Sequence, residues 1–196
     1  RSRLSPVNFQ DTQLIGVLAR AESTVSSLSS LLGGLVEKFA ARGYSLYLVG
    51  GSVRDALLGR LGNDLDFTTP ARPEVVKEIL DEWAETVWDT GIDFGTVSAA
   101  YKGQQIEITT FRSDSYDGQS RNPEVVYGDT LEGDLVRRDF KANAMAIELL
   151  ADASFKFHDP LHGLQDIADR VLDTPDKPEI SFHDDPLRML LSLIHI

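Results

Sequence analysis

The first strong pattern along the chain is a helical spacing of apolar residues between Ser23 and Gly43. We predict a helix here, and Gly43 is placed to end it. Residues 1–23 show no sustained periodicity, so we expect a poorly ordered arm. The apolar positions of the predicted helix are Val25, Leu28, Leu31, Leu32, Leu35, Val36 and Phe39.

A buried strand, a glycine turn and a short helix are predicted next. Residues 46–49 are apolar and bounded by glycine, which indicates a strand. Two glycines then turn the chain into a helix. Ser52 and Asp55 match a capping box at its start, and Gly59 stands where a helix ends.

The rest of the pattern alternates helices with short strands. Residues 96–100 and 105–109 flank a Lys-Gly turn, which predicts a hairpin. The polar stretch 112–135 is predicted to be a long loop, and such loops inside compact domains are usually functional or mobile. The other predicted elements are a helix after Pro73, a helical turn from Arg138 that leads into a strand at 147–150, a strand at 155–158, and helices at 163–172 and from Asp185.

Composition narrows the class of protein without indicating a function. The 196 residues are 42% hydrophobic and 26% charged, as in ordinary globular proteins. No apolar run reaches the length of a membrane span and no secretory signal is visible, so we expect a cytoplasmic protein without a membrane partner. The absence of cysteine excludes disulfides and thiolate metal sites. A net charge of −12 argues against a chain that clamps nucleic acid with its whole surface.

The glycine turn is a candidate site for phosphate. Gly50 and Gly51 let the backbone approach an anion closely, and free N–H groups at the start of the next helix point toward it. Arg54, on the first turn of that helix, adds a cation that pairs with phosphate. The spacing fits neither GxGxxG nor GxxxxGK[ST]. The competing interpretation is a tight turn beside a surface arginine.

Three carboxylates are candidates for binding a divalent metal. Asp64 and Asp66 alternate with apolar residues, so both lie on one face of a predicted strand. Two like charges this close favour a cation between them, and Glu107 of the predicted hairpin can join the same face. Carboxylates, metal and a phosphate turn together indicate phosphoryl-type transfer by two metal ions. Taken singly, each carboxylate also fits a solvated strand face.

Two further clusters are candidates for nucleotide recognition. Arg138 and Asp139, preceded by Arg137, offer cations beside a short acceptor, which suits a triphosphate and a ribose hydroxyl. The alternative is a surface ion cluster. Asp185 and Arg188 are three apart on a predicted helix, so they share one face and can bind the edge of a base. The alternative is a capped helix start with an ion pair.

Taken together, these segments resemble a bacterial class II tRNA nucleotidyltransferase, the family of CCA-adding enzymes and the closely similar poly(A) polymerases. The resemblance runs from Leu46 to Leu190 in the family's order. Its motifs are LVGGSVRDALLG, NDLDFT, IEITTFR, RRDFKANAMAIEL, DPLHGLQDIADRVL and DDPLRML. Asp184 stands where the family usually has glutamate, and Lys141 where it commonly has threonine. From Leu191 the sequence LSLIHI does not continue the family's helix.

The resemblance implies an α+β nucleotidyltransferase fold, a small mixed β-sheet flanked by helices. It implies a head domain over residues 24–160 and the start of an all-helical neck over residues 161–196, cut short before the body that grips tRNA. The residues it assigns are Asp64, Asp66 and Glu107 as catalytic carboxylates, Asp64 and Asp66 as ligands of Mg²⁺, and Gly50, Gly51, Ser52, Arg54, Arg138, Asp139, Asn143, Asp185 and Arg188 as nucleotide contacts.

The implied activity is metal-dependent, template-independent transfer of nucleotides from CTP and ATP to the 3′ end of tRNA, which is CCA addition. Poly(A) polymerase activity and partial addition of CC or A stay open, because the motifs do not separate them. A third alternative is an inactive nucleotide-binding fragment, since the tRNA-binding body is missing. The oligomeric state does not follow from the sequence.

Overall fold

A computed structural model describes residues 9–32, 34–113, 126–178 and 181 of the chain. The helices are α1 (Phe9–Leu31), α2 (Leu35–Ala41), α3 (Gly50–Leu57), α4 (Pro73–Asp81), α5 (Leu131–Val136) and α6 (Gly163–Asp169), with 3-10 turns η1 (Ile92–Phe94) and η2 (Lys141–Asn143). The strands are β1 (Leu46–Val49), β2 (Asp64–Thr69), β3 (Thr86–Trp88), β4 (Thr96–Tyr101), β5 (Gln104–Thr110), β6 (Ala146–Leu149) and β7 (Phe155–His158).

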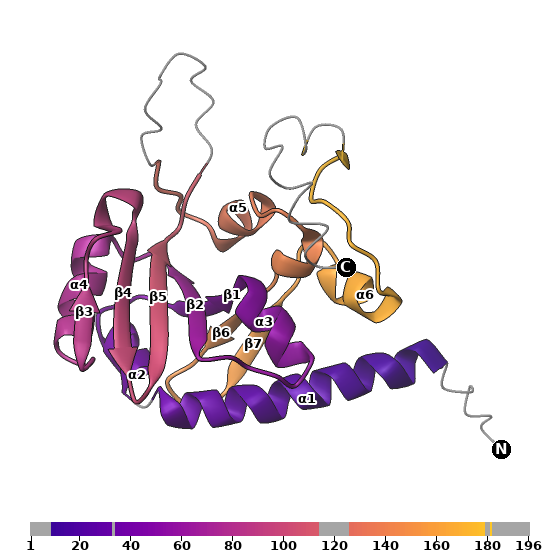
Figure 1. Ribbon diagram of the computed structural model, residues 1–196, viewed down its shortest axis with the longest axis horizontal. Coiled ribbons are helices and arrows are strands. Elements are labelled where there is room, and N and C mark those ends of the chain that lie inside the picture. Colours follow the sequence, from indigo (N-terminus) through magenta and orange to yellow (C-terminus); the bar gives the residue numbers. More distant parts are fainter. Residues whose placement is uncertain (1–8, 33, 114–125, 179–180, 182–196) are drawn as a thin grey trace, which may run out of the picture.

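The strands form one mixed sheet in the order β3-β4-β5-β2-β1-β6-β7 (Figure 1). Strands β2 and β5 are parallel, and the other neighbouring pairs are antiparallel. The predicted hairpin is confirmed as β4 and β5, joined at Lys102 and Gly103. Both turn residues have positive φ, as the two-residue turn that suits the twist of a hairpin requires. Helices packed on a mixed sheet confirm the α+β class.

The two faces of the central strands differ in polarity. Leu48, Phe67 and Ile108 are fully or almost fully buried on the face that α1 to α4 cover. Burial of each such side chain contributes about 1.5–3 kcal/mol to folding. The opposite face carries Asp66 and Glu107, which are both exposed. The period of two along the strands therefore separates a hydrophobic core from a polar face that is free to form a site.

The N-terminal segment is more regular than the sequence predicted. Helix α1 already begins at Phe9, so the expectation of a poorly ordered arm was wrong for most of residues 1–23. Buried Val17 and Ala21 extend the helical spacing of Val25 toward the N-terminus, and α1 packs on α3. Small and polar residues between these positions dilute the apolar pattern, and only packing on α3 makes this face a buried one.

The helix predicted between Ser23 and Gly43 is in fact two helices. Gly34 has a φ of +83° at the start of α2, and a left-handed residue cannot continue the preceding helix. The predicted end is confirmed, because α2 stops just before Gly43, whose φ is +80°. No helix in the described part of the chain has the length and hydropathy of a membrane span.

The predicted loop 112–135 also needs correction. Helix α5 occupies its C-terminal end, and Thr130 caps that helix by accepting a hydrogen bond from N of Gly133 at 3.2 Å. Residues 114–125 lie outside the described residues. Helix α6 ends at Asp169, a little earlier than expected. The strands predicted near residues 46–49, 147–150 and 155–158 are confirmed as β1, β6 and β7.

Candidate active site

The glycine turn, Gly50 and Gly51 at the start of α3, is a point where three segments approach closely. Gly50 has a φ of +64°, a left-handed conformation that glycine adopts without strain. A Cβ at this position would lie 3.0 Å from Nη1 of Arg138 and 3.9 Å from Oδ2 of Asp66. Because Gly50 has no side chain, an arginine and an aspartate can approach the same point beside the turn.

Ser52 does not cap α3 as predicted. No side chain caps α3, so the predicted capping box of Ser52 and Asp55 was wrong. The buried Ser52 Oγ accepts a hydrogen bond from N of Asp66 at 3.0 Å and donates one to the carbonyl oxygen of Asp64 at 3.4 Å. This hydroxyl therefore joins α3 to β2 and fixes both aspartates beside the turn. The predicted end of α3 is confirmed at Gly59, which has a φ of +72°.

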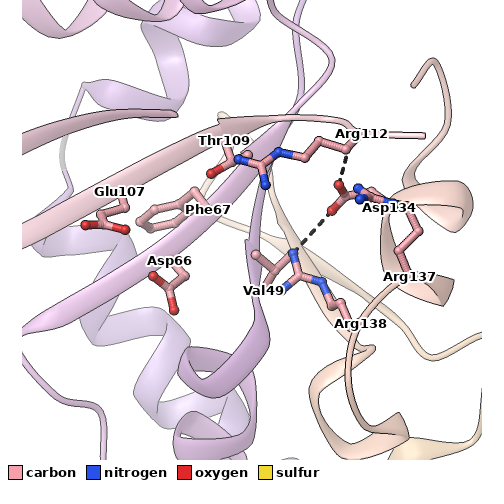
Figure 2. Close-up of a pocket in the computed structure, with 9 residues that line it drawn as sticks. All are labelled: Val49, Asp66, Phe67, Glu107, Thr109, Arg112, Asp134, Arg137 and Arg138. Carbon is pink, nitrogen blue, oxygen red and sulfur yellow. Dashed lines mark hydrogen bonds and ion pairs between the residues drawn. The ribbon is translucent and has the colours of Figure 1, made fainter. Parts of the chain in front are cut away.

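Asp66 and Glu107 are paired in register on the parallel strands β2 and β5. Both line a pocket of about 320 Å³ on the polar face of the sheet (Figure 2). Asp64 lies two residues earlier on the same face of β2, but it is not among the residues that line this pocket. The structure thus brings two of the three predicted carboxylates together and places the third beside them.

The two pocket carboxylates suit a divalent cation. Although Asp66 is exposed to solvent, desolvation by the surrounding pocket wall and the charge of Glu107 raise its pKa, and Arg138 opposes this effect. Among the described residues, no group of three or more acidic or histidine side chains is arranged to hold a metal ion alone. Mg²⁺ commonly takes one or two carboxylates and completes its shell with water and phosphate oxygens. Asp66 and Glu107 therefore fit a Mg²⁺ ion that a bound triphosphate helps to coordinate.

Three arginines, Arg112, Arg137 and Arg138, line the other side of the pocket, and we call them the arginine wall (Figure 2). Burial and the neighbouring charge of Arg137 lower the pKa of Arg112 from its ordinary value. Nε of Arg112 and Nε of Arg138 are buried without a hydrogen-bond partner in the described part of the chain. Three half-buried guanidinium groups on one side of the pocket suit a polyanion such as a triphosphate.

A chain of hydrogen bonds runs from α3 to η2 beside the pocket. Nη1 of Arg54 donates to Oδ1 of Asn143 at 3.1 Å, and Nδ2 of Asn143 donates to Oδ1 of Asp139 at 3.0 Å. The same Asp139 oxygen accepts from N of Phe140. These contacts bring together three residues that the resemblance assigned to nucleotide binding. Asp185 and Arg188 lie outside the described residues.

Arg112 and Asp134 are pocket residues that the sequence analysis did not select. Arg112 lies two residues after the end of β5, and Asp134 lies on α5, inside the predicted loop. Asp134 accepts hydrogen bonds from N of Arg112 at 3.1 Å and from Nη2 of Arg138 at 3.2 Å. The spacing of four between Asp134 and Arg138 was a usable signal, but only for a segment recognised as helical.

Comparison with known proteins decides the family. Residues 46–173, more than half of the chain, match the model of the poly A polymerase head domain. The chain belongs to this family. The matched residues include the glycine turn, the paired carboxylates of β2 and β5, and the whole arginine wall.

The chain is also similar to CCA-adding enzymes and to a tRNA nucleotidyltransferase. The CCA-adding enzyme of Listeria innocua is 41% identical over 157 residues, which are 80% of this chain and 38% of that enzyme. The Bacillus stearothermophilus CCA-adding enzyme, solved in complex with CTP, is 37% identical with a TM-score of 0.67, over 84% of this chain and 37% of the other. A tRNA nucleotidyltransferase solved with a primer tRNA and an incoming ATP analog is 31% identical with a TM-score of 0.66. The match covers 81% of this chain and 43% of the other. The chain spans about two fifths of the length of these relatives.

Proposed function

We propose that this chain forms the catalytic head of an enzyme that adds C and A to the 3′ end of tRNA, without a template and with Mg²⁺. The observation that carries the proposal is the register pairing of Asp66 with Glu107 across one pocket from the arginine wall. Groups for a cation and groups for a triphosphate thus share one site. Because the chain spans about two fifths of its relatives' length, the activity of the whole protein belongs to the proposal.

The proposed reaction transfers a nucleotide from CTP or ATP to RNA. The oxygen of the RNA 3′-hydroxyl forms a bond to the α-phosphorus, and the bond from that phosphorus to the oxygen of the β-phosphate breaks. Pyrophosphate leaves, and the proton of the hydroxyl passes to solvent. Mg²⁺, when bound, stabilises negative charge on the phosphoryl oxygens. Asp66 and Glu107, with Asp64 beside them, are the groups that would hold this ion.

The remaining residues bind and orient the nucleotide in this proposal. The arginine wall neutralises the triphosphate, and the lack of side chains at Gly50 and Gly51 lets Arg138 and Arg54 lie close to the turn that binds it. Arg54, Asn143 and Asp139 are joined by hydrogen bonds beside the glycine turn, where they bind the ribose and its phosphates. Asp185 and Arg188 are proposed to read the edge of the base. We place this activity in the cytoplasm.

The test supplies Mg²⁺ and a tRNA that lacks its 3′ CCA, with CTP, ATP or both. It is run on this chain and on a chimera that continues it with the remainder of the Listeria innocua enzyme. Incorporation of both nucleotides supports the proposal. Long tails from ATP alone would indicate a poly(A) polymerase, and a single added nucleotide type a partial adder. A chimera that binds nucleotide but transfers none would make the proposal wrong.

Two variants of the chimera make the assignment specific. Asp66→Asn keeps the size of the side chain and removes the charge, and it should abolish incorporation. Glu74→Gln removes an exposed charge from the first turn of α4, away from the pocket, and it should leave incorporation unchanged. Normal activity in Asp66→Asn would show that Asp66 does not bind the metal ion.

A further inference from the structure

Asp134 is a buried carboxylate in the wall of the pocket. Only 6% of its surface is exposed, and burial of an unpaired carboxylate is costly. Its two oxygens divide between two partners, since Oδ1 accepts from N of Arg112 at 3.1 Å and Oδ2 accepts from Nη2 of Arg138 at 3.2 Å (Figure 2). One side chain of α5 therefore binds two members of the arginine wall, Arg112 through its backbone and Arg138 through its guanidinium.

The guanidinium of Arg138 lies between two carboxylates. Its Nη2 contacts Asp134, while its Nη1 lies 3.0 Å from the position that a Cβ of Gly50 would take. Oδ2 of Asp66 is 3.9 Å from that same position. Oδ2 of Asp66 and Nη1 of Arg138 therefore approach the same point beside Gly50. The ion pair that Arg138 forms within the described residues is nevertheless with Asp134.

We infer that Asp134 is a positioning residue that keeps Arg138 from pairing with Asp66. The inference rests on the proposed function, in which Asp66 binds a cation and Arg138 binds a triphosphate. With Asp134 in place, the two groups face the pocket separately and each remains available. Without its charge, Arg138 turns toward the next carboxylate and neutralises it. The site then loses a cation ligand and an anion ligand in one step.

The first measurement is direct binding of CTP by this chain, with EDTA and then with Mn²⁺. Asp134→Asn preserves the shape of the side chain and should weaken binding about tenfold in both conditions, the usual consequence of removing one charge-assisted hydrogen bond. The matched control is Thr130→Ala, which removes the N-cap of the same helix but contacts neither arginine. This control should lower the thermal midpoint and leave the affinity for CTP unchanged.

The second measurement is Mn²⁺ binding without nucleotide, followed by the electron paramagnetic resonance signal of free Mn²⁺. Asp134→Asn should weaken Mn²⁺ binding several-fold, because the released Arg138 competes for Asp66. Arg138→Gln should not weaken it, since this variant removes the competing cation. The double variant should behave like Arg138→Gln alone, because Asp134 acts through that arginine. A loss of Mn²⁺ affinity in Asp134→Asn that is absent from Arg138→Gln and from the double variant separates positioning from a loss of structure.

Several results would overturn the inference. One is an equal loss of CTP affinity in Asp134→Asn and Thr130→Ala, which assigns the loss to α5 as a whole. Another is a loss of Mn²⁺ affinity in Asp134→Asn that persists unchanged in the double variant. If Asp134→Asn does not fold, the Arg138→Gln variant decides. Weaker Mn²⁺ binding in Arg138→Gln than in the unaltered chain would overturn the inference. If the unaltered chain binds no CTP, the proposed function fails, and the Mn²⁺ series still decides the role of Asp134.

Discussion

Arg54 and Asn143 lie 89 positions apart in the sequence and are joined by a hydrogen bond of 3.1 Å. This bond links the helix that follows the glycine turn to the segment that follows the arginine wall. Asn143 is almost fully buried, and its amide nitrogen also binds Asp139. The guanidinium of Arg54 is thus oriented by a residue from a different motif, and both motifs act on the same bound nucleotide in the proposed function.

Replacement of Asn143 by alanine should therefore weaken nucleotide binding. The loss of the acceptor for Arg54 should cost about 1–2 kcal/mol of binding free energy, which is roughly tenfold in the dissociation constant. Isothermal titration of CTP into the two chains measures this difference. Gln165→Ala is the control, because its amide forms an exposed hydrogen bond on α6. Equal affinity in Asn143→Ala and the unaltered chain would show that this bond does not orient Arg54.

Alanine substitutions at Gly50 and Gly43 distinguish the effect of backbone strain from that of a steric clash. Both have positive φ, so alanine at either position costs about 1–2 kcal/mol of stability. At Gly43 a Cβ meets nothing within 4 Å, whereas at Gly50 it meets Nη1 of Arg138 at 3.0 Å. Thermal unfolding should show similar losses, but only Gly50→Ala should also abolish CTP binding. Retained binding in Gly50→Ala would mean that Arg138 moves aside without consequence.

Lys141, which stands where the resembled family commonly has threonine, forms an ion pair with Asp173. N of Lys141 also donates to the carbonyl oxygen of Asp173 at 2.9 Å. The packing there is close, since a Cβ on Gly163 would lie 2.1 Å from the carbonyl oxygen of Lys141. Lys141, the residue that departs from the family motif, thus binds Asp173 in the segment after α6. These contacts join η2 to that segment.

The pH dependence of stability should report this ion pair. The hydrogen bond from Lys141 lowers the pKa of Asp173 from 3.8, so its contribution is present above that value and is lost as the pH falls through the lowered pKa. Lys141→Met should destabilise the chain by less than about 1 kcal/mol at pH 7, because the pair is partly exposed. The difference from the unaltered chain should shrink at acidic pH in denaturant unfolding. If the difference in unfolding free energy between Lys141→Met and the unaltered chain stayed constant down to pH 2, the ion pair would not be its cause.

Metal binding should depend on the nucleotide. Within the described residues no three acidic or histidine side chains are arranged to hold an ion, so Mg²⁺ needs phosphate oxygens to complete its shell. Titration calorimetry should therefore show weak binding of Mg²⁺ alone and at least tenfold tighter binding when CTP is present. Glu107→Gln should reduce this enhancement, while Glu74→Gln should not. Tight binding of Mg²⁺ to the free chain would contradict a two-carboxylate site.

Local patterns predicted the elements around the glycine turn. Alternation of Asp64 and Asp66 with apolar residues correctly placed both carboxylates on one face of β2, and turn residues placed the hairpin that carries Glu107. The same reasoning missed the start of α1 and the whole of α5, because neither has a strong apolar period of its own. Those helices are defined by what they pack against.

The sequence by itself determined which residues are candidates for a site. Its motifs and local periods predicted a phosphate site at the glycine turn, a metal site at Asp64, Asp66 and Glu107, and nucleotide contacts in the arginine-aspartate segment. Only the tertiary structure decided how they meet, because parallel pairing of β2 with β5 and the position of α5 depend on contacts between distant segments. The two strands bring Asp66 beside Glu107, and Asp134 of α5 holds Arg138 across from them. No local pattern encodes that arrangement.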